Sequence, residues 1–235
     1  MSPFIGEFIG TALLIIMGGG VVANVVLNKT KGQNSGWIVI TFGWAMAVFL
    51  GVYASNKLGG SGHLNPAVTI GLSTLGDFDV SLLPTYLIAQ FAGAFTGAVI
   101  VWIAYKQHFD ETTEKDLKLA VFSTAPAIRN PVYNLLTEIV GTFILVFGAL
   151  NISKSAATMG ALDALPVALL VLGIGLSLGG PTGYAINPAR DLGPRIAHFV
   201  LPIKEKRDSD WSYAWVPVVG PIIGGLVAVF VFKLL

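Results

Sequence analysis

The sequence predicts an all-α membrane protein in which six transmembrane helices and two re-entrant half-helices form an inverted repeat. Three observations predict this fold class: little charge, six apolar segments of membrane-spanning length, and two half-length apolar segments that begin with the same tripeptide. Of the 235 residues, 54% are hydrophobic and 11% are charged, whereas a soluble domain carries about a quarter charged residues. The chain has too little charge to cover a soluble globule, so we expect it to face a lipid bilayer.

Composition also excludes several classes of function. The chain has no cysteine, which excludes thiolate metal sites and thiol nucleophiles. Its net charge of +1 and the lack of a basic stripe give no sign of nucleic-acid binding. His63, His108 and His198 lack a metal-ligand spacing, so we expect neither a metal nor a cofactor. We expect His63 to orient a nearby loop and the other two histidines to lie at the surface.

The six long apolar segments are the candidate transmembrane helices. Each reaches or approaches the length of about 20 residues that a bilayer-spanning helix needs. The first is too long for the apolar part of a signal peptide and follows no basic segment, so we expect it to remain as a span. A polar stretch at 106–131 divides the chain in two. The segments are 4–27, 36–56, 82–105, 132–152, 164–180 and 213–234.

The two halves of the chain resemble each other. The pattern Glu-x-x-Gly-Thr begins at Glu7 and again at Glu138, and Gln90-Phe-Ala-Gly is matched by Pro221-Ile-Ile-Gly. We therefore predict a single domain over residues 1–235, with a first repeat at 1–105 and a second at 132–235. Because each half has an odd number of full spans, the second half must enter the membrane from the opposite side, and the repeat is inverted.

The two half-length segments begin at Asn65-Pro-Ala and Asn187-Pro-Ala, and we predict half-helices at 65–75 and 187–198. Asn favours the N-cap of a helix and Pro its first turn. A half-span is tolerated within the membrane where it lines a polar cavity, and paired broken segments indicate a conduction site. We therefore expect Asn65 and Asn187 to donate hydrogen bonds into a central pore from opposite sides. The helix N-termini, each with about half a positive charge, would disfavour cations there.

At these residues the chain resembles the major intrinsic protein family, the aquaporins and glycerol facilitators. The resemblance rests on Ser61–Thr69, Gly183–Asp191 and the two Glu-x-x-Gly-Thr patterns, and it extends over nearly the whole chain. It implies a homotetramer with one passive pore per subunit and no enzymatic activity. Gly175-Leu-Ser-Leu-Gly179 matches the hydrolase pattern G-x-S-x-G, but it lies within a predicted span rather than at a strand-to-helix turn. The small chain and short termini are typical of a bacterial plasma-membrane protein.

The resemblance also implies roles for individual residues. Glu7 and Glu138 would brace the loops that precede the half-helices, because a carboxylate in a bilayer is costly unless it is paired. For the second-span residue of the selectivity filter, alignment favours Ile40, with Phe42 and Trp44 as alternatives. Backbone carbonyls would form an acceptor ladder through the pore at Ser61, Gly62, His63, Gly183, Tyr184 and Ala185. The selectivity filter would comprise Ile40, Gly175, Tyr184 and Arg190.

Three residues resemble markers of the glycerol-facilitator branch: Asp191, Arg195 and Pro221. Gly175 stands where water channels place a histidine, which would widen the pore. We therefore expect small neutral solutes to pass, glycerol and water foremost, while ions and protons are excluded. An apolar, non-aromatic Ile40 would also admit undissociated lactic acid. A strict water channel and a secondary transporter with broken helices stay open as alternatives.

The resemblance implies a cytoplasmic N-terminus, and the distribution of basic residues opposes this orientation. The inner side would carry only Lys57, Lys154 and Lys233 of the 14 Lys and Arg residues. Short cytoplasmic loops usually carry the excess of positive charge. The sequence therefore leaves the orientation open.

Overall fold

The computed structural model describes residues 2–76, 78–152 and 158–235. Within these ranges the regular structure is helical throughout, and six helices are long and apolar enough to cross a membrane. The predicted fold class is therefore confirmed. The long helices are α1 (Pro3–Val26), α2 (Trp37–Lys57), α4 (Leu83–Ala104), α7 (Pro131–Asn151), α8 (Leu165–Leu178) and α10 (Val216–Leu234).

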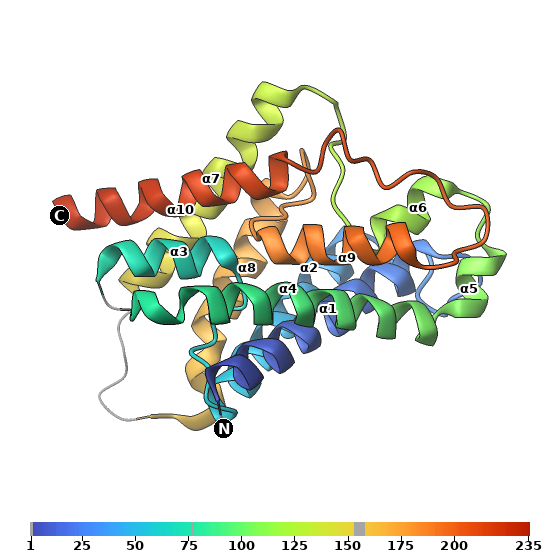
Figure 1. Cartoon of the computed structure of the whole chain (residues 1–235). Coiled ribbons are helices and arrows are strands. Elements are labelled where there is room, and N and C mark those ends of the chain that lie inside the picture. The colour runs from blue at the N-terminus through green and yellow to red at the C-terminus, as the bar shows by residue number, and fades with distance from the viewer. Residues whose placement is uncertain (1, 77, 153–157) are drawn as a thin grey trace.

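Two shorter helices, α3 (Pro66–Leu75) and α9 (Pro188–Val200), run from the middle of the molecule toward its two opposite ends (Figure 1). In the first half α1 packs against α2 and α4, and in the second half α7 packs against α8 and α10. Each half-helix packs mainly on the other half of the chain: α3 on α10, and α9 on α4. This exchange is what an inverted repeat requires, and it places both half-helix N-termini at the centre.

Four short helices lie in the connections. They are α5 (Lys106–Glu111) and α6 (Lys115–Ala120) in the connection between the halves, and the 3-10 helices η1 (Val80–Leu82) and η2 (Gly160–Ala164) before α4 and α8. The end of the molecule that holds α5 and α6 also carries the loop between α9 and α10 (Figure 1).

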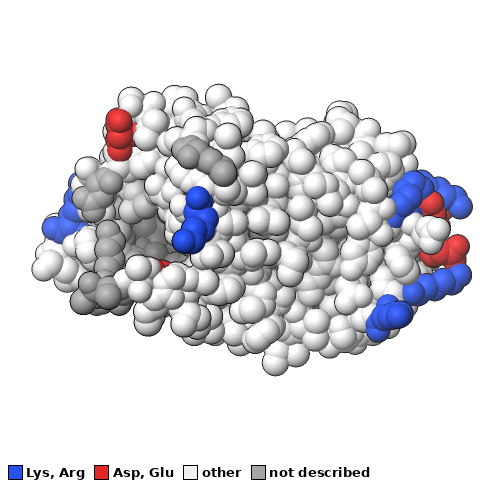
Figure 2. Space-filling model, turned by 90° about the horizontal axis from the view of Figure 1, so that it is seen from below, with Lys and Arg blue, Asp and Glu red and all other residues white. Residues whose placement is uncertain are grey.

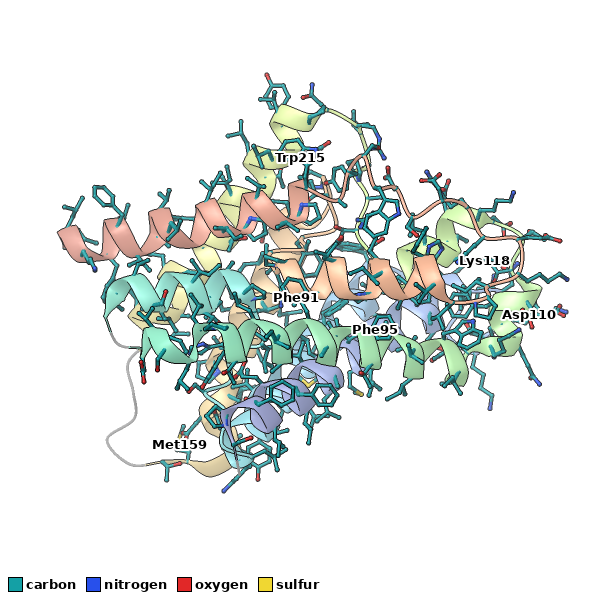
Figure 3. The ribbon with its side chains drawn as sticks, viewed as in Figure 1. Phe91, Phe95, Asp110, Lys118, Met159 and Trp215 are labelled. Carbon is teal, nitrogen blue, oxygen red and sulfur yellow. The ribbon has the colours of Figure 1, made fainter. Side chains whose placement is uncertain are left out.

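Glycines allow the helices of each half to approach closely. A Cβ atom at Gly93 of α4 would lie 2.3 Å from the carbonyl oxygen of Phe8 in α1. At the matching position of the second repeat, a Cβ atom at Gly224 of α10 would lie 2.4 Å from the carbonyl oxygen of Ile139 in α7. Small residues at such crossings permit tight backbone packing, which drives helix association in membranes. Gly193 does the same for the half-helix α9, which sits on α4 near Phe91 and Phe95 (Figure 3).

The surface matches a membrane environment. On the face shown in Figure 2, charged side chains gather toward the two ends and a broad uncharged band separates them. Large apolar side chains are exposed on the long helices, for example Ile88 and Ile103 of α4 and Phe230 of α10. Lys154, one of the basic residues assigned to the inner side, lies outside the described residues.

Candidate conduction pore

The two Asn-Pro-Ala tripeptides start the half-helices. Asn65 and Asn187 are in extended conformation at the N-caps, and a proline follows each in the first turn. The Asn65 side-chain oxygen accepts from the backbone N–H of Ala67 at 2.9 Å. The Asn187 oxygen accepts from those of Ala189 at 3.0 Å and Arg190 at 3.2 Å. Because the oxygens are engaged within their own helices, each side-chain amide is oriented with its NH2 group away from its helix.

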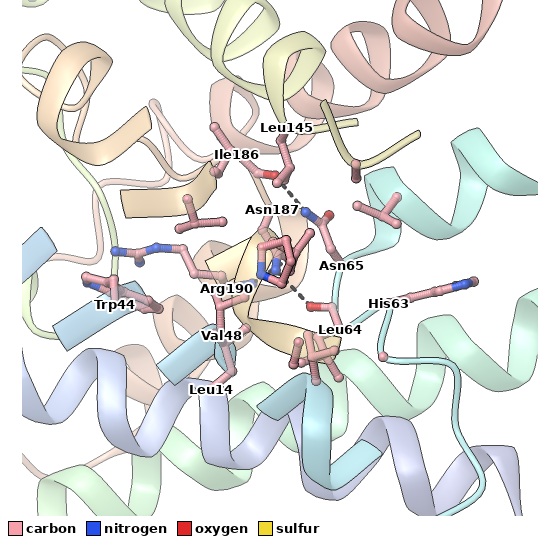
Figure 4. A pocket seen from close by; sticks show the side chains of 18 of the residues that line it. Leu14, Trp44, Val48, His63, Leu64, Asn65, Leu145, Ile186, Asn187 and Arg190 are labelled. Carbon is pink, nitrogen blue, oxygen red and sulfur yellow. Dashed lines mark hydrogen bonds between the residues drawn. The ribbon is translucent and has the colours of Figure 1, made fainter. Parts of the chain in front are cut away.

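The same two amides tie the halves together. The NH2 group of Asn65 donates to the carbonyl of Ile186, and that of Asn187 donates to the carbonyl of Leu64, both at 2.8 Å (Figure 4). From the sequence we expected each NH2 group to donate into the pore. In the structure one hydrogen of each is used across the interface between the repeats, which leaves one per residue for a solute. These bonds also fix the distance between the half-helix N-termini.

Glu7 braces the loop before α3. It is fully buried, and its two carboxylate oxygens accept from the backbone N–H groups of His63 at 3.0 Å and Leu64 at 2.8 Å. The side chains of Ser55 at 3.0 Å and Gln90 at 2.8 Å complete its hydrogen bonds. Gln90 belongs to a repeated pattern in the sequence, but nothing in that pattern showed that it meets Glu7.

Glu138 does the same for the loop before α9. It is 1% exposed and accepts from the backbone N–H groups of Ala185 at 3.1 Å and Ile186 at 2.8 Å, and from the hydroxyl of Thr182 at 2.7 Å. Neither glutamate lies at the surface, so these are buried carboxylates held by hydrogen bonds rather than interfacial charges.

The bracing has a consequence for the backbone carbonyls of both loops. Each glutamate turns successive N–H groups toward itself, and left-handed residues allow this: Leu64 has φ 52° and Ile186 has φ 42°. Since the N–H groups point to the glutamates, carbonyl oxygens of the same segments are left to face the other way. A cavity of about 400 Å³ lies on that side. Of the predicted ladder, the lining includes Ser61, Gly62, His63, Tyr184 and Ala185, but not Gly183.

The cavity combines a few polar groups with a largely apolar wall. Asn65, Asn187 and Arg190 line it together with the loop backbones. The rest of the wall is mainly aliphatic and includes Leu14, Val48, Val52, Leu145, Val167 and Val171. Such a passage offers hydrogen bonds in few directions and contact with apolar surface in the others.

At one part of this cavity the guanidinium of Arg190 lies over the ring of Trp44, 4.3 Å from the ring centre (Figure 4). Both residues line the cavity. Ile40 is buried in the hydrophobic core but does not line the cavity, and Phe42 is 54% exposed on the outside of α2. Of the three candidates on α2, Trp44 is the one that meets Arg190 in this cavity. Ile40 and Trp44 are four residues apart and so lie on one face of α2, one helical turn from each other.

Gly175 lies behind the wall of the cavity rather than in it. A Cβ atom at this position would lie 2.8 Å from the Tyr184 ring, so the ring fills the space that a side chain at 175 would take. Tyr184 is 6% exposed and lines the cavity. The glycine thus allows the Tyr184 ring to pack directly against α8.

Asp191 and Arg195 form a fully buried ion pair at 2.7 Å, four residues apart on α9. Asp191 also accepts from the backbone N–H and the hydroxyl of Thr124, both at 2.7 Å. Arg195 donates to the carbonyls of Thr124 at 2.9 Å and Ser209 at 2.7 Å. The pair therefore holds the loops that carry Thr124 and Ser209 against α9. Neither it nor Pro221, which is buried in α10, lines the cavity.

One expectation for the histidines was wrong. His198 is fully buried rather than at the surface, with its Nδ1 2.8 Å from the Ser209 hydroxyl and its ring against Phe122. His63 lines the cavity, and its Nδ1 lies 3.1 Å from the Thr69 hydroxyl in the first half-helix.

Comparison with known proteins agrees with this geometry. Residues 1–232 match the family described as "Major intrinsic protein". The chain is 57% identical over 233 residues to a probable glycerol uptake facilitator protein of Thermotoga maritima, with 99% of both chains covered. It is 53% identical to a glycerol uptake facilitator protein of Streptococcus pneumoniae, over 100% of this chain and 99% of the other. An X-ray structure of the aquaglyceroporin from Plasmodium falciparum superposes with a TM-score of 0.86 at 34% identity, covering 98% of this chain and 94% of that one. The chain belongs to the major intrinsic protein family.

Proposed function

We propose that this protein is a passive membrane channel that conducts glycerol and water. The observation that carries the proposal is the arrangement of Arg190 over Trp44 beside Tyr184, in a cavity that continues to Asn65 and Asn187. Relatives that share half or more of its residues over nearly its full length are glycerol uptake facilitators.

The chemistry of glycerol suits this passage. Its carbon chain forms an apolar edge, for which Trp44 and Tyr184 offer aromatic surface. Its hydroxyl groups lie along the opposite edge, where Arg190 can donate and the loop carbonyls can accept hydrogen bonds. A solute whose polar edge is paired along the way avoids the penalty for an unpaired buried hydroxyl, which is about 1–3 kcal/mol in proteins.

Ions are not stabilised in the same way. The half-helix N-termini meet at Asn65 and Asn187, and each carries about half a positive charge. A cation at this point meets positive potential from both sides after losing its water. Anions gain from Arg190 but must then cross the aliphatic wall, where desolvation costs far more than it does for a neutral solute. We infer that the channel excludes both.

The solute range depends on the residues around Arg190. The case for undissociated lactic acid depended on a non-aromatic Ile40 in the filter, whereas the guanidinium of Arg190 packs on the aromatic ring of Trp44. We therefore propose glycerol rather than a broader solute. By resemblance we also propose a homotetramer in a bacterial plasma membrane, for which the exposed apolar side chains of the long helices provide the surface.

Reconstitution in liposomes tests the proposal. After a hyperosmotic glycerol gradient is imposed, the vesicles should shrink and then re-swell by light scattering, and the re-swelling should be at least about tenfold faster than in empty vesicles, because the pore removes the desolvation barrier of the bilayer. Fast water exchange without faster glycerol entry would instead indicate a strict water channel.

A further inference from the structure

Trp37 is the first residue of α2 and is 42% exposed, yet its side chain reaches the residues behind the cavity wall. Its indole N–H donates to the carbonyl oxygen of Gly175 at 3.1 Å. Because α8 ends at Leu178, that carbonyl is among the last four of the helix, which have no partner within it. Trp37 thus satisfies the end of α8 from a neighbouring helix.

Trp37 also contacts the filter aromatic. Its ring meets that of Tyr184 edge to face, with centroids 5.9 Å apart at 78°. The space between α2 and α8 is closed here, since a Cβ atom at Gly179 would lie 2.6 Å from the Trp37 ring and 2.6 Å from the Tyr184 ring. Edge-to-face pairs of this kind add about 0.5–1.5 kcal/mol beyond the burial of area.

Tyr184 depends on such packing. Its hydroxyl is buried and has no hydrogen-bond partner among the described residues. Its backbone is left-handed, with φ 37°, which a tyrosine adopts only when its surroundings hold it there. With no hydrogen bond to anchor the ring, its position depends on packing against Gly175, Gly179 and Trp37.

We propose that Trp37 is a positioning residue for the filter. It holds Tyr184 against α8 and thereby determines the width of the passage beside Arg190, although it does not itself line the cavity. The inference rests on the proposed function, because it concerns how the glycerol passage selects its solutes by size.

The test compares Trp37→Ala and Trp37→Phe with the unmodified protein in liposomes, using glycerol and the larger polyol erythritol. In Trp37→Ala the Tyr184 ring can move into the vacated space, so the ratio of erythritol to glycerol permeability should rise at least about threefold. Trp37→Phe retains the aromatic contact but not the N–H donor. Its permeability ratio should lie between those of the unmodified protein and Trp37→Ala.

A permeability ratio separates positioning from mere folding, because a poorly folded channel loses both solutes together. Trp215→Ala is the matched control: Trp215 is 43% exposed at the N-cap of α10 and lies away from α2 (Figure 3). Its ratio should equal that of the unmodified protein. An unchanged ratio in both Trp37 variants, with glycerol still conducted, would overturn the inference and leave the proposed function intact. If the unmodified protein conducts no glycerol, both the proposed function and the role of Trp37 are contradicted.

Discussion

Gly175→Phe should remove most of the glycerol conduction while the protein still inserts into the membrane. A Cβ atom at Gly175 would already lie 2.8 Å from the Tyr184 ring and 3.0 Å from the Thr41 methyl group. A phenyl group in this place must push Tyr184 toward Trp44 and Arg190, across the passage. Overpacking of this kind costs about 1–3 kcal/mol in stability, but it should lower glycerol permeability at least about tenfold in the re-swelling assay, since the displaced ring fills the path.

Gly173→Phe is the control for this effect. Gly173 lies in the same helix, two residues earlier, and a Cβ atom there would meet nothing within 4 Å. The same glycine-to-phenylalanine change should therefore leave glycerol permeability near that of the unmodified protein. Equal losses in both variants would show that α8 tolerates no phenylalanine, and the role given to Tyr184 would lose its support.

Glu138→Leu should unfold the second half of the pore. The fully enclosed carboxylate accepts hydrogen bonds from Thr182, Ala185 and Ile186, and leucine leaves all three donors unpaired. Each unpaired buried donor costs about 1–3 kcal/mol, so the thermal midpoint of the purified protein should fall by about 10 °C or more. Glycerol permeability should be lost with it, because the loop that carries Ala185 and Ile186 is no longer oriented.

Two variants separate this bracing from a general effect of lost charge. Glu138→Gln keeps one side-chain oxygen as an acceptor, so it should retain part of the stability and permeability. Glu114→Leu removes a carboxylate at an exposed position and should leave both near normal. A thermal midpoint for Glu138→Leu equal to that of Glu114→Leu would contradict the bracing role.

Much of the fold could be predicted from the sequence because the membrane allows few solutions. An apolar segment that crosses a bilayer must be a helix, so the predicted spans agree with the observed helices to within a few residues. The starts of the half-helices could also be predicted, since Asn65-Pro66 and Asn187-Pro188 combine an N-cap with a first-turn proline.

The details of the proposed filter could not be predicted from the sequence because they depend on packing between distant segments. Ile40 and Trp44 lie on the same face of α2, and the contact of Arg190 with Trp44 depends on the position of α9 relative to this helix, which no local pattern reveals. The cross-links from Asn65 and Asn187 and the role of Trp37 were not predicted. They join residues more than 100 positions apart, and no local pattern marks such pairs.

The most direct test of the account is the dependence of glycerol flux on its concentration. A passive pore with Arg190 and Trp44 fixed in place predicts an initial rate that rises in proportion to the glycerol gradient, and that is the same with and without a proton or sodium gradient across the liposome membrane. A rate that saturates at low concentration, or that requires an ion gradient, would contradict the account and indicate a transporter that alternates between two states.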